Sequence, residues 1–373
     1  MIINSIKLKN FRNYNELDIS FNSNQNIIIG NNAQGKTNII EAIYYLAITK
    51  SFLVNNDKTI INKDSDSSLI ISNILFNNKK KKLSILINSM TKKLFINDKE
   101  IKKHAEYIGN LKVIIFSPDT VRVLKEGPGN RRRFLNIELS QLYNIYVNIL
   151  NDYNSLLKQR NEYLKNIKLT NNFNKIYMDI INDRYVSLNI SIIKYRYNFV
   201  NKINEYISDI YYNIAGDNGL KIKYVPCIKY EEESIMRENL LSKIRNSYDR
   251  EILLGSSIIG SHREDFGFYL DDLDLSLYGS QGQVKMAILS LKLAEAFVFK
   301  DICDEYPVLL LDDVFSELDV NKRNNLIKYL NFDIQSIITT TDLNDIDNEF
   351  ASKANIYKVE NCSVTIDNNR EKV

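Results

Sequence analysis

The stretch "IIIGNNAQGKTNIIEAIYYLA", residues 27–47, decides the fold. Gly30 is followed by four residues and then by Gly35-Lys36-Thr37, which is the spacing of a phosphate-binding loop. The apolar run before Gly30 predicts a strand, and residues 38–47 predict a helix. Backbone N–H groups of such a loop form an anion-binding nest at the start of the helix. The stretch therefore predicts a nucleoside triphosphate site in an α/β fold.

Two side chains of this loop have predicted tasks. Lys36 would reach the β- and γ-phosphates, and the Thr37 hydroxyl would ligate Mg²⁺. A chance glycine-rich turn is the alternative, but a strand before the loop and a helix after it argue against that. The predicted nucleotide-binding residues of the loop are Gly30, Asn31, Asn32, Ala33, Gln34, Gly35, Lys36, Thr37 and Asn38.

A second acidic motif complements the loop. "PVLLLDDVFSELD", residues 307–319, is an apolar strand that ends in two acids, as in a Walker B motif. Asp312 would hold Mg²⁺ through its water shell, and Asp313 stands where many ATPases carry a catalytic, water-polarising carboxylate. A buried parallel strand followed by two solvated acids is the structural alternative.

The third motif opens a helix. In "YGSQGQVKMAILSLKLAE", residues 278–295, Ser280 precedes Gln283 by three positions, which is a capping box. The same residues are similar to the signature of ABC ATPases, whose serine and helix N-terminus face a γ-phosphate held by another subunit. The residues predicted to act in this way on a second copy are Ser280, Gln281, Gly282 and Gln283.

A long helical segment separates these motifs. Residues 130–215 contain neither Gly nor Pro, so long helices are permitted there. Apolar residues recur at steps of three and four, and residues 169–174 read as a turn between two helices. The stripe comprises Leu142, Tyr146, Ile149, Tyr153 and Leu156.

The predicted architecture is an α/β ATPase lobe interrupted by a helical lobe. The ATPase lobe is expected over residues 1–125 and 255–373, with an antiparallel meander over 69–99. The helical lobe with its hairpin arm is expected over 126–254. Residues 216–255 within this segment give no clear pattern.

Composition narrows the class of protein. The 373 residues are 44% hydrophobic and 25% charged, as in an ordinary globular protein, and the net charge is only +3. Any nucleic-acid surface must therefore be local. The three cysteines lack CxxC spacing, so we expect neither disulfides nor zinc, and a reducing cytosol. We also expect no signal peptide and no membrane span.

Several blocks together resemble the RecF family of bacterial recombination mediators. The resemblance spans the chain and is most distinctive over residues 116–161. The other matching blocks are "LKNFRNY" at 8–14, the phosphate-binding loop, "GSHRED" at 260–265, "YGSQGQ" at 278–283, "LLLDDVFSELD" at 309–319 and "TTTDL" at 339–343. Three positions depart from residues that are frequent in the family: Leu53, Ser261 and Lys285.

The resemblance implies an ABC-type head of the SMC and Rad50-like branch. It implies Mg²⁺ and ATP as cofactors, ATP-driven pairing of two copies, slow hydrolysis as a switch, and DNA binding at gaps or junctions. It also implies cooperation with RecR and RecO in loading RecA. By motif position, Asp319 would be the D-loop acid, Thr341 and Asp342 the switch residues, and Arg12 a residue approaching the nucleotide.

Two basic clusters are candidates for contact with DNA phosphates. Arg131, Arg132 and Arg133 begin the helical arm, and Lys80 and Lys81 lie within the run Lys79 to Lys82. For the lysine run, a solvated turn is the stronger interpretation. His262 and Arg263 are distinctive, but the sequence assigns them no role.

Two other functions remain as alternatives. A transporter ATPase subunit would have a more compact spacing than the roughly 240 residues between Thr37 and Ser280. A small-molecule kinase would use the phosphate-binding loop alone, and the serine motif would then be only a helix cap.

Overall fold

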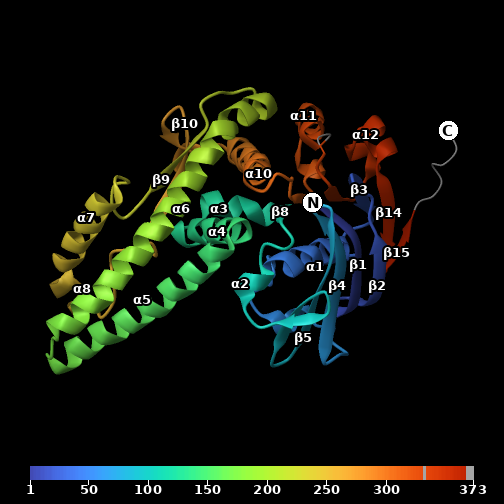
Figure 1. Ribbon diagram of the computed structural model, residues 1–373. Helices are drawn as coiled ribbons and strands as arrows, with labels where there is room; N and C mark the ends of the chain where they lie inside the picture. The colour runs from blue at the N-terminus through green and yellow to red at the C-terminus, as the bar shows by residue number, and fades with distance from the viewer. Residues whose placement is uncertain (331–332, 367–373) are drawn as a thin grey trace. The chain divides into compact units, whose positions relative to one another are not determined.

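The computed structural model describes residues 1–330 and 333–366 and divides into two compact units. An antiparallel sheet forms one layer of the first unit (Figure 1). Its residues alternate between buried and solvent-facing positions, which is the pattern of a sheet with one face on the core. In spatial order the strands are β2 (Tyr14–Ser20), β1 (Ile2–Phe11), β4 (Ser67–Phe76), β5 (Lys79–Asn88), β6 (Lys92–Ile96) and β7 (Lys99–Ile101).

A mixed sheet forms the second layer. Five of its strands are parallel, and only its edge strand β15 runs antiparallel. Every residue of β8, β12 and β13 is buried, which explains the continuous apolar runs of β8 and of β12 up to Leu311. The spatial order is β15 (Ser363–Ile366), β14 (Asn355–Glu360), β3 (Gln25–Ile29), β13 (Ser336–Thr340), β12 (Val308–Asp312) and β8 (Val113–Phe116).

Helix α1 (Lys36–Ile48) lies between the two sheets and contacts strands of both (Figure 1). It is buried on almost all sides, as expected for a helix that is apolar all round. Its N-terminus follows β3 and lies at the carboxyl ends of β12 and β13. Ligands of open α/β sheets bind at this edge, so the fold itself indicates where a site would form.

Further helices complete this unit. They are the helices α2 (His104–Tyr107), α10 (Gln281–Cys303), α11 (Val320–Leu330) and α12 (Asn348–Lys353), and the 3₁₀ helices η1 (Asp57–Ile60), η2 (Pro118–Val121), η3 (Phe315–Glu317) and η4 (Leu343–Asp345). Helix α10 packs on β8 through its apolar face.

The second unit is mostly helical. Helices α5 (Asn144–Thr170) and α6 (Lys175–Ala215) form the predicted hairpin, and the turn between them is where the sequence placed it. The residues of α6 from Tyr206 onward group with the first unit. The other elements are α3 (Arg122–Lys125), α4 (Pro128–Leu142), α7 (Glu233–Arg245), α8 (Tyr248–Leu254), α9 (Leu275–Tyr278), and a small sheet of β11 (Leu273–Asp274), β10 (Asp265–Leu270) and β9 (Lys221–Val225).

One detail of the predicted apolar stripe is wrong. Leu142 is the last residue of α4, because Tyr143 takes an extended conformation with φ −132° and ψ 105° and starts a new helix. Of the remaining stripe residues, Tyr146, Tyr153 and Leu156 are buried along α5.

The compact units and the predicted lobes divide the chain at different places. The first unit comprises Met1–Val121, Tyr206–Asn218 and Gln281–Val373, and the second comprises Arg122–Glu205 and Gly219–Ser280. Residues 255–280, which we expected in the ATPase lobe, thus group with the helices, since β10 pairs with β9. The last residues of the expected lobe, 367–373, lie outside the described residues.

Candidate nucleotide site

Two glycines shape the loop between β3 and α1. A Cβ on Gly30 would lie 2.4 Å from the carbonyl oxygen of Val359, so β14 leaves room for glycine alone. Gly35 has φ 107°, and a Cβ there would lie 2.8 Å from the Tyr14 hydroxyl. Any side chain at either position would move the loop away from the strands that support it. The glycine spacing of the motif is thus explained by contacts within the chain.

The Lys36 side chain bends back over the loop, so that its ammonium contacts loop carbonyl groups. Its Nζ donates to the carbonyl oxygens of Gly30 at 2.6 Å and Asn31 at 3.0 Å. Burial lowers the pKa of Lys36, and the charges of Asp313 and Asp312 oppose this shift. An ammonium has three donors, so this arrangement keeps one for an anion at the mouth of the loop.

A chain of hydroxyl groups holds Asp312. Thr37 Oγ1 donates to Asp312 Oδ1 at 3.0 Å, and Thr339 Oγ1 donates to the same oxygen at 2.7 Å. Burial raises the pKa of Asp312, and these two hydrogen bonds oppose the rise. A buried carboxylate beside a hydroxyl suits Mg²⁺, which binds one or two protein ligands together with phosphate oxygens. The residues therefore fit the metal predicted for Thr37 and Asp312.

The main chain at Asp313 has an uncommon conformation, with φ 54°. Its N–H donates to the carbonyl and hydroxyl oxygens of Thr339, at 3.2 and 3.0 Å. Among the described residues, no group hydrogen-bonds its buried Oδ1. The backbone thus turns at Asp313, so its carboxylate does not share the hydrogen-bond partners of the Asp312 carboxylate. A catalytic carboxylate distinct from the metal ligand would need such an arrangement.

These side chains line one cavity of about 220 Å³. The cavity brings together the predicted phosphate and metal residues, and it adds Asn13, which the sequence had not indicated. Its lining is Asn13, Asn32, Ala33, Gly35, Lys36, Thr37, Asn38, Asp312 and Asp313.

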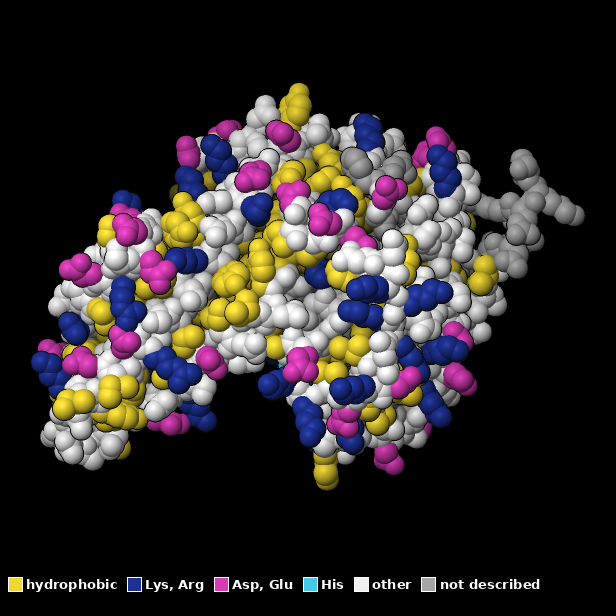
Figure 2. Space-filling model, viewed as in Figure 1, with side chains coloured by type: hydrophobic (Ala, Val, Ile, Leu, Met, Phe, Trp, Pro, Cys, Tyr) yellow, Lys and Arg dark blue, Asp and Glu magenta, His cyan; other side chains and the backbone are white. Residues whose placement is uncertain are grey.

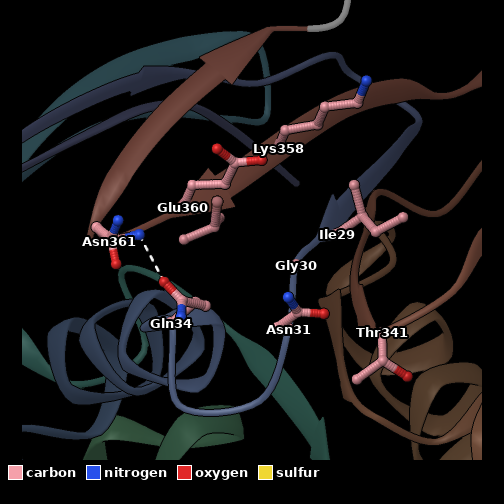
Figure 3. Close-up of a pocket in the computed structure, with 9 residues that line it drawn as sticks. Ile29, Gly30, Asn31, Gln34, Thr341, Lys358, Glu360 and Asn361 are labelled. Carbon is pink, nitrogen blue, oxygen red and sulfur yellow. Dashed lines mark hydrogen bonds between the residues drawn. The ribbon is translucent and has the colours of Figure 1, made fainter.

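Gly30, Asn31 and Gln34 line a second pocket, of about 420 Å³, on the other side of the loop. Lys358 and Glu360 of β14 also line this pocket, and Figure 3 shows the Lys358 side chain extending away from the loop and the hydrogen bond between Asn361 and Gln34. Thr341, a predicted switch residue, also lines this pocket.

Arg12 is engaged by protein groups. Its Nε and Nη2 form a two-pronged ion pair with Glu41 at 2.7 and 2.6 Å, and Nη1 donates to the Thr59 carbonyl at 2.9 Å. It does not line the 220 Å³ cavity, whereas its neighbour Asn13 does. In this structure Arg12 compensates the buried carboxylate of α1.

Comparison with known proteins decides the family. A family model described as the RecF/RecN/SMC N terminal domain matches residues 2–365. A DNA replication and repair protein RecF from Ligilactobacillus salivarius is 35% identical over 372 residues, which cover 99% of this chain and 98% of the relative. The same-named protein of Listeria monocytogenes serotype 4b is 37% identical over 367 residues, or 98% and 99% of the two chains. The chain belongs to the RecF family.

A solved structure of the recombination mediator protein RecF with ATP, in the RecFOR pathway, extends this match to three dimensions. It superposes with a TM-score of 0.89 at 31% identity, over 98% of each chain. The predicted ABC-type ATPase fold is therefore confirmed. The described residues contain no helix that is both long enough and apolar enough to cross a membrane.

The signature residues of this RecF-family chain begin α10. Ser280, Gln281 and Gly282 are exposed, and Gln283 is half-buried. The motif is thus accessible at the start of a long helix, as action on a second copy would require. That action, and the capping box, remain predictions.

The other predicted switch-related residues have local roles in the structure. Asp319 accepts from the N–H and ammonium of Lys322 at 3.0 and 2.6 Å, which stabilises the first turn of α11. Hydrogen bonds from Lys322 lower the pKa of Asp319. Asp342 accepts from the N–H of Asn344 at 2.9 Å and caps η4.

The predicted DNA-contact residues differ in how far they are paired. Arg131 is held by Asp265, Arg132 donates to the Glu264 carbonyl at 2.8 Å, and Arg133 is exposed. The prediction that the lysine run forms a turn is wrong, because Lys79 to Lys82 begin strand β5 and pair with β4. Lys81 donates to Asn110 at 2.8 Å, whereas Lys80 is exposed. Over the antiparallel sheet, Figure 2 shows Lys and Arg side chains interspersed with Asp and Glu. The sheet surface is therefore mixed in charge.

Proposed function

We propose that this chain is an ATP-dependent DNA-binding protein of recombinational repair, in which ATP closes two copies on DNA. The observation that carries the nucleotide part is the hydrogen bond from Thr37 to Asp312 beside the Lys36 ammonium. The DNA part is supported by family membership, since the relatives are named DNA replication and repair proteins.

The residues of the 220 Å³ cavity would divide the work at the nucleotide. The loop N–H groups and Lys36 would bind the β- and γ-phosphates, and Thr37 and Asp312 would hold Mg²⁺. The metal would neutralise charge that develops between the β- and γ-phosphates. Asp313 would orient the attacking water. A lone head with these groups would hydrolyse ATP slowly, which suits a switch stimulated by DNA.

The second copy would complete the site. Ser280 and the N-terminus of α10 would face the γ-phosphate held by the partner's loop, since a helix N-terminus stabilises a nearby negative charge. The exposure of Ser280, Gln281 and Gly282 supports this arrangement. Near the same interface between the two copies would lie Asp319, Thr341 and Asp342.

The expected partners follow from the family. Gapped duplexes or junctions between single- and double-stranded DNA would be the substrates on which the two copies close. RecR and RecO would cooperate with this chain in loading RecA. A RecF structure described as a recombination mediator in the RecFOR pathway supports the pathway, although the loading step itself comes from the family resemblance. A cytoplasmic location fits the three free cysteines.

DNA binding with and without ATP tests this proposal. We expect ATP and Mg²⁺ to tighten binding to a gapped duplex more than binding to single strands, and we expect the affinity to fall with salt. Equal, salt-independent binding with and without ATP would contradict the proposal. For a transporter subunit or a small-molecule kinase, ATP would leave the affinity for DNA unchanged.

A further inference from the structure

The turn that carries His262 and Arg263 is fixed from several directions. The His262 ring lies between the Tyr153 hydroxyl, 2.8 Å from Nδ1, and the Ser257 carbonyl, 3.0 Å from Nε2. The N–H of Ser261 donates to Asn189 at 2.6 Å. Helices α5 and α6 thus hold the backbone of residues 257–262 through buried polar contacts.

Buried ion pairs fix both ends of the same turn. Arg160 pairs with Glu251 at 2.6 Å and donates to the Ser257 hydroxyl at 2.6 Å. Arg196 pairs with Glu264 at 2.8 Å. All four charged side chains are at most 2% exposed. Such pairs cost desolvation energy and are a weak source of stability, so their visible effect is to define one geometry.

The side chain that this fixed turn presents to solvent is Arg263. It is exposed, and it forms no ion pair or hydrogen bond with the side chains that the structure describes. Its own N–H closes the turn by donating to the Gly260 carbonyl at 2.9 Å. The guanidinium therefore extends from a rigid base without an internal partner.

A second guanidinium is held beside it. Arg132 Nη1 donates to the carbonyl oxygen of Glu264, the residue that follows Arg263, at 2.8 Å. Arg131 donates two hydrogen bonds of 2.6 and 2.7 Å to the Asp265 carboxylate, and these bonds fix the N-terminal end of α4 against β10. The acidic side chains next to Arg263 are thus already engaged, Glu264 by Arg196 and Asp265 by Arg131.

We propose that Arg263 and Arg132 form a fork that binds a phosphate of the DNA backbone. Planar guanidinium groups match phosphate oxygens in two-pronged geometry, and a site whose backbone and one of whose guanidinium groups are held in advance loses less entropy on binding. Burial lowers the pKa of Arg132, and the positive charges of Arg196 and Arg263 lower it further. An anion at the fork would relieve this repulsion. The inference rests on the proposed DNA-binding function.

An acidic protein segment offers carboxylates of similar chemistry, but the family favours the nucleic acid. The fork would contribute a sequence-independent contact that positions the duplex. It would also give the distinctive pair His262 and Arg263 separate tasks. His262 is a positioning residue inside the turn, and Arg263 is the contact.

The test is a salt series of fluorescence anisotropy titrations with a labelled gapped duplex, using the full chain with ATP and Mg²⁺. We expect Arg263→Ala to weaken binding about tenfold and to reduce the slope of log affinity against log salt by about one contact. Arg263→Lys keeps the charge but loses the two-pronged guanidinium, so its DNA affinity should lie between those of the wild type and Arg263→Ala. The matched control is Arg250→Ala, which removes an exposed arginine of α8 and should match the wild type.

The outcomes separate this inference from the function on which it rests. Wild-type protein that does not bind the duplex would overturn both. Wild-type binding with an unchanged salt slope in Arg263→Ala would overturn the fork alone. Loss of ATP-driven pairing in Arg263→Ala without loss of DNA affinity would also overturn it, as would weakened binding of a poly-glutamate probe only. Circular dichroism should show the same thermal midpoint for the three variants and the wild type.

Discussion

The phosphate-binding loop and the His262 turn both concentrate charged side chains around a short backbone turn, but they use them differently. Around the loop, Lys36 and Asp313 border a cavity and keep donors and acceptors that protein groups do not occupy. Around the turn, Arg160, Arg196 and Glu264 are buried in ion pairs within the protein. The first region is built to receive a ligand, and the second is built to hold a shape. Substitutions of the loop side chains should therefore affect ATP binding, whereas substitutions of the buried ion pairs around the turn should affect folding.

The largest effect is expected at Arg160. Replacement by Met would leave the Glu251 carboxylate buried without its partner, which costs about 3–5 kcal/mol of the free energy of unfolding. Urea denaturation measures it. The control is Arg184→Met, because Arg184 and Asp152 are 65% and 59% exposed and 3.6 Å apart, and such pairs contribute about 0–1 kcal/mol. If both variants lost the same free energy of unfolding, the buried ion pairs of the turn would not differ in stability from an exposed pair, and the comparison would be contradicted.

The next effect is on ATP binding at Lys36. Lys36→Met removes a charged donor from the phosphates and should weaken ATP binding by about 100-fold. Nucleotide titration by calorimetry measures the affinity, and Lys50→Met, which alters an exposed lysine just beyond α1, is the control. Wild-type affinity in Lys36→Met would mean that the cavity is not the phosphate site.

Thr339 links the two acidic residues, so its loss should change the metal requirement. Thr339→Val removes the hydroxyl that donates to Asp312 and accepts from the Asp313 N–H. The Mg²⁺ concentration for half-maximal ATP binding should rise about tenfold, while affinity at saturating Mg²⁺ changes little. Thr339→Ser should restore the wild-type value. A loss of ATP affinity that excess Mg²⁺ does not correct would assign Thr339 a purely structural role.

The smallest effect is a pH dependence of stability. Burial lowers the pKa of His262 and of His104, the only two histidines of the chain. The unfolded chain then takes up these protons first as pH falls, so the free energy of unfolding is highest above about pH 6.5 and decreases towards pH 5. His262→Gln should flatten this decrease in part, and His104→Gln should flatten the remainder. An unchanged slope in His262→Gln would show that the imidazole is not held neutral in the turn.

The sequence predicted most of the nucleotide site because its parts are local. Glycine spacing, a strand before it and a helix after it are all visible in residues 25–48, and the apolar run into Asp312 is equally clear. Thr339 and Asn13 were missed because their roles depend on tertiary structure, which brings β13 beside β12 and the turn between β1 and β2 to the same cavity as the loop.

Arg12 and His262 illustrate what a single sequence cannot give. The partner of Arg12 is Glu41, one of several acids within reach along the chain, and only the packing of α1 selects it. The His262 ring is held by Tyr153, which is 109 residues away in the chain. The division into compact units likewise depends on the pairing of β9 with β10, which are separated in the chain by residues 226–264.

Sedimentation velocity with ATP and Mg²⁺ tests the central claim most directly. An Asp313→Asn variant should bind ATP without turning it over, because Thr37 and Asp312 still hold the metal. We predict that this variant forms dimers with ATP and remains monomeric without it, and that a further Ser280→Arg change abolishes the dimer while ATP binding persists. An Asp313→Asn protein that stays monomeric at tens of micromolar with saturating ATP and gapped DNA would contradict the account.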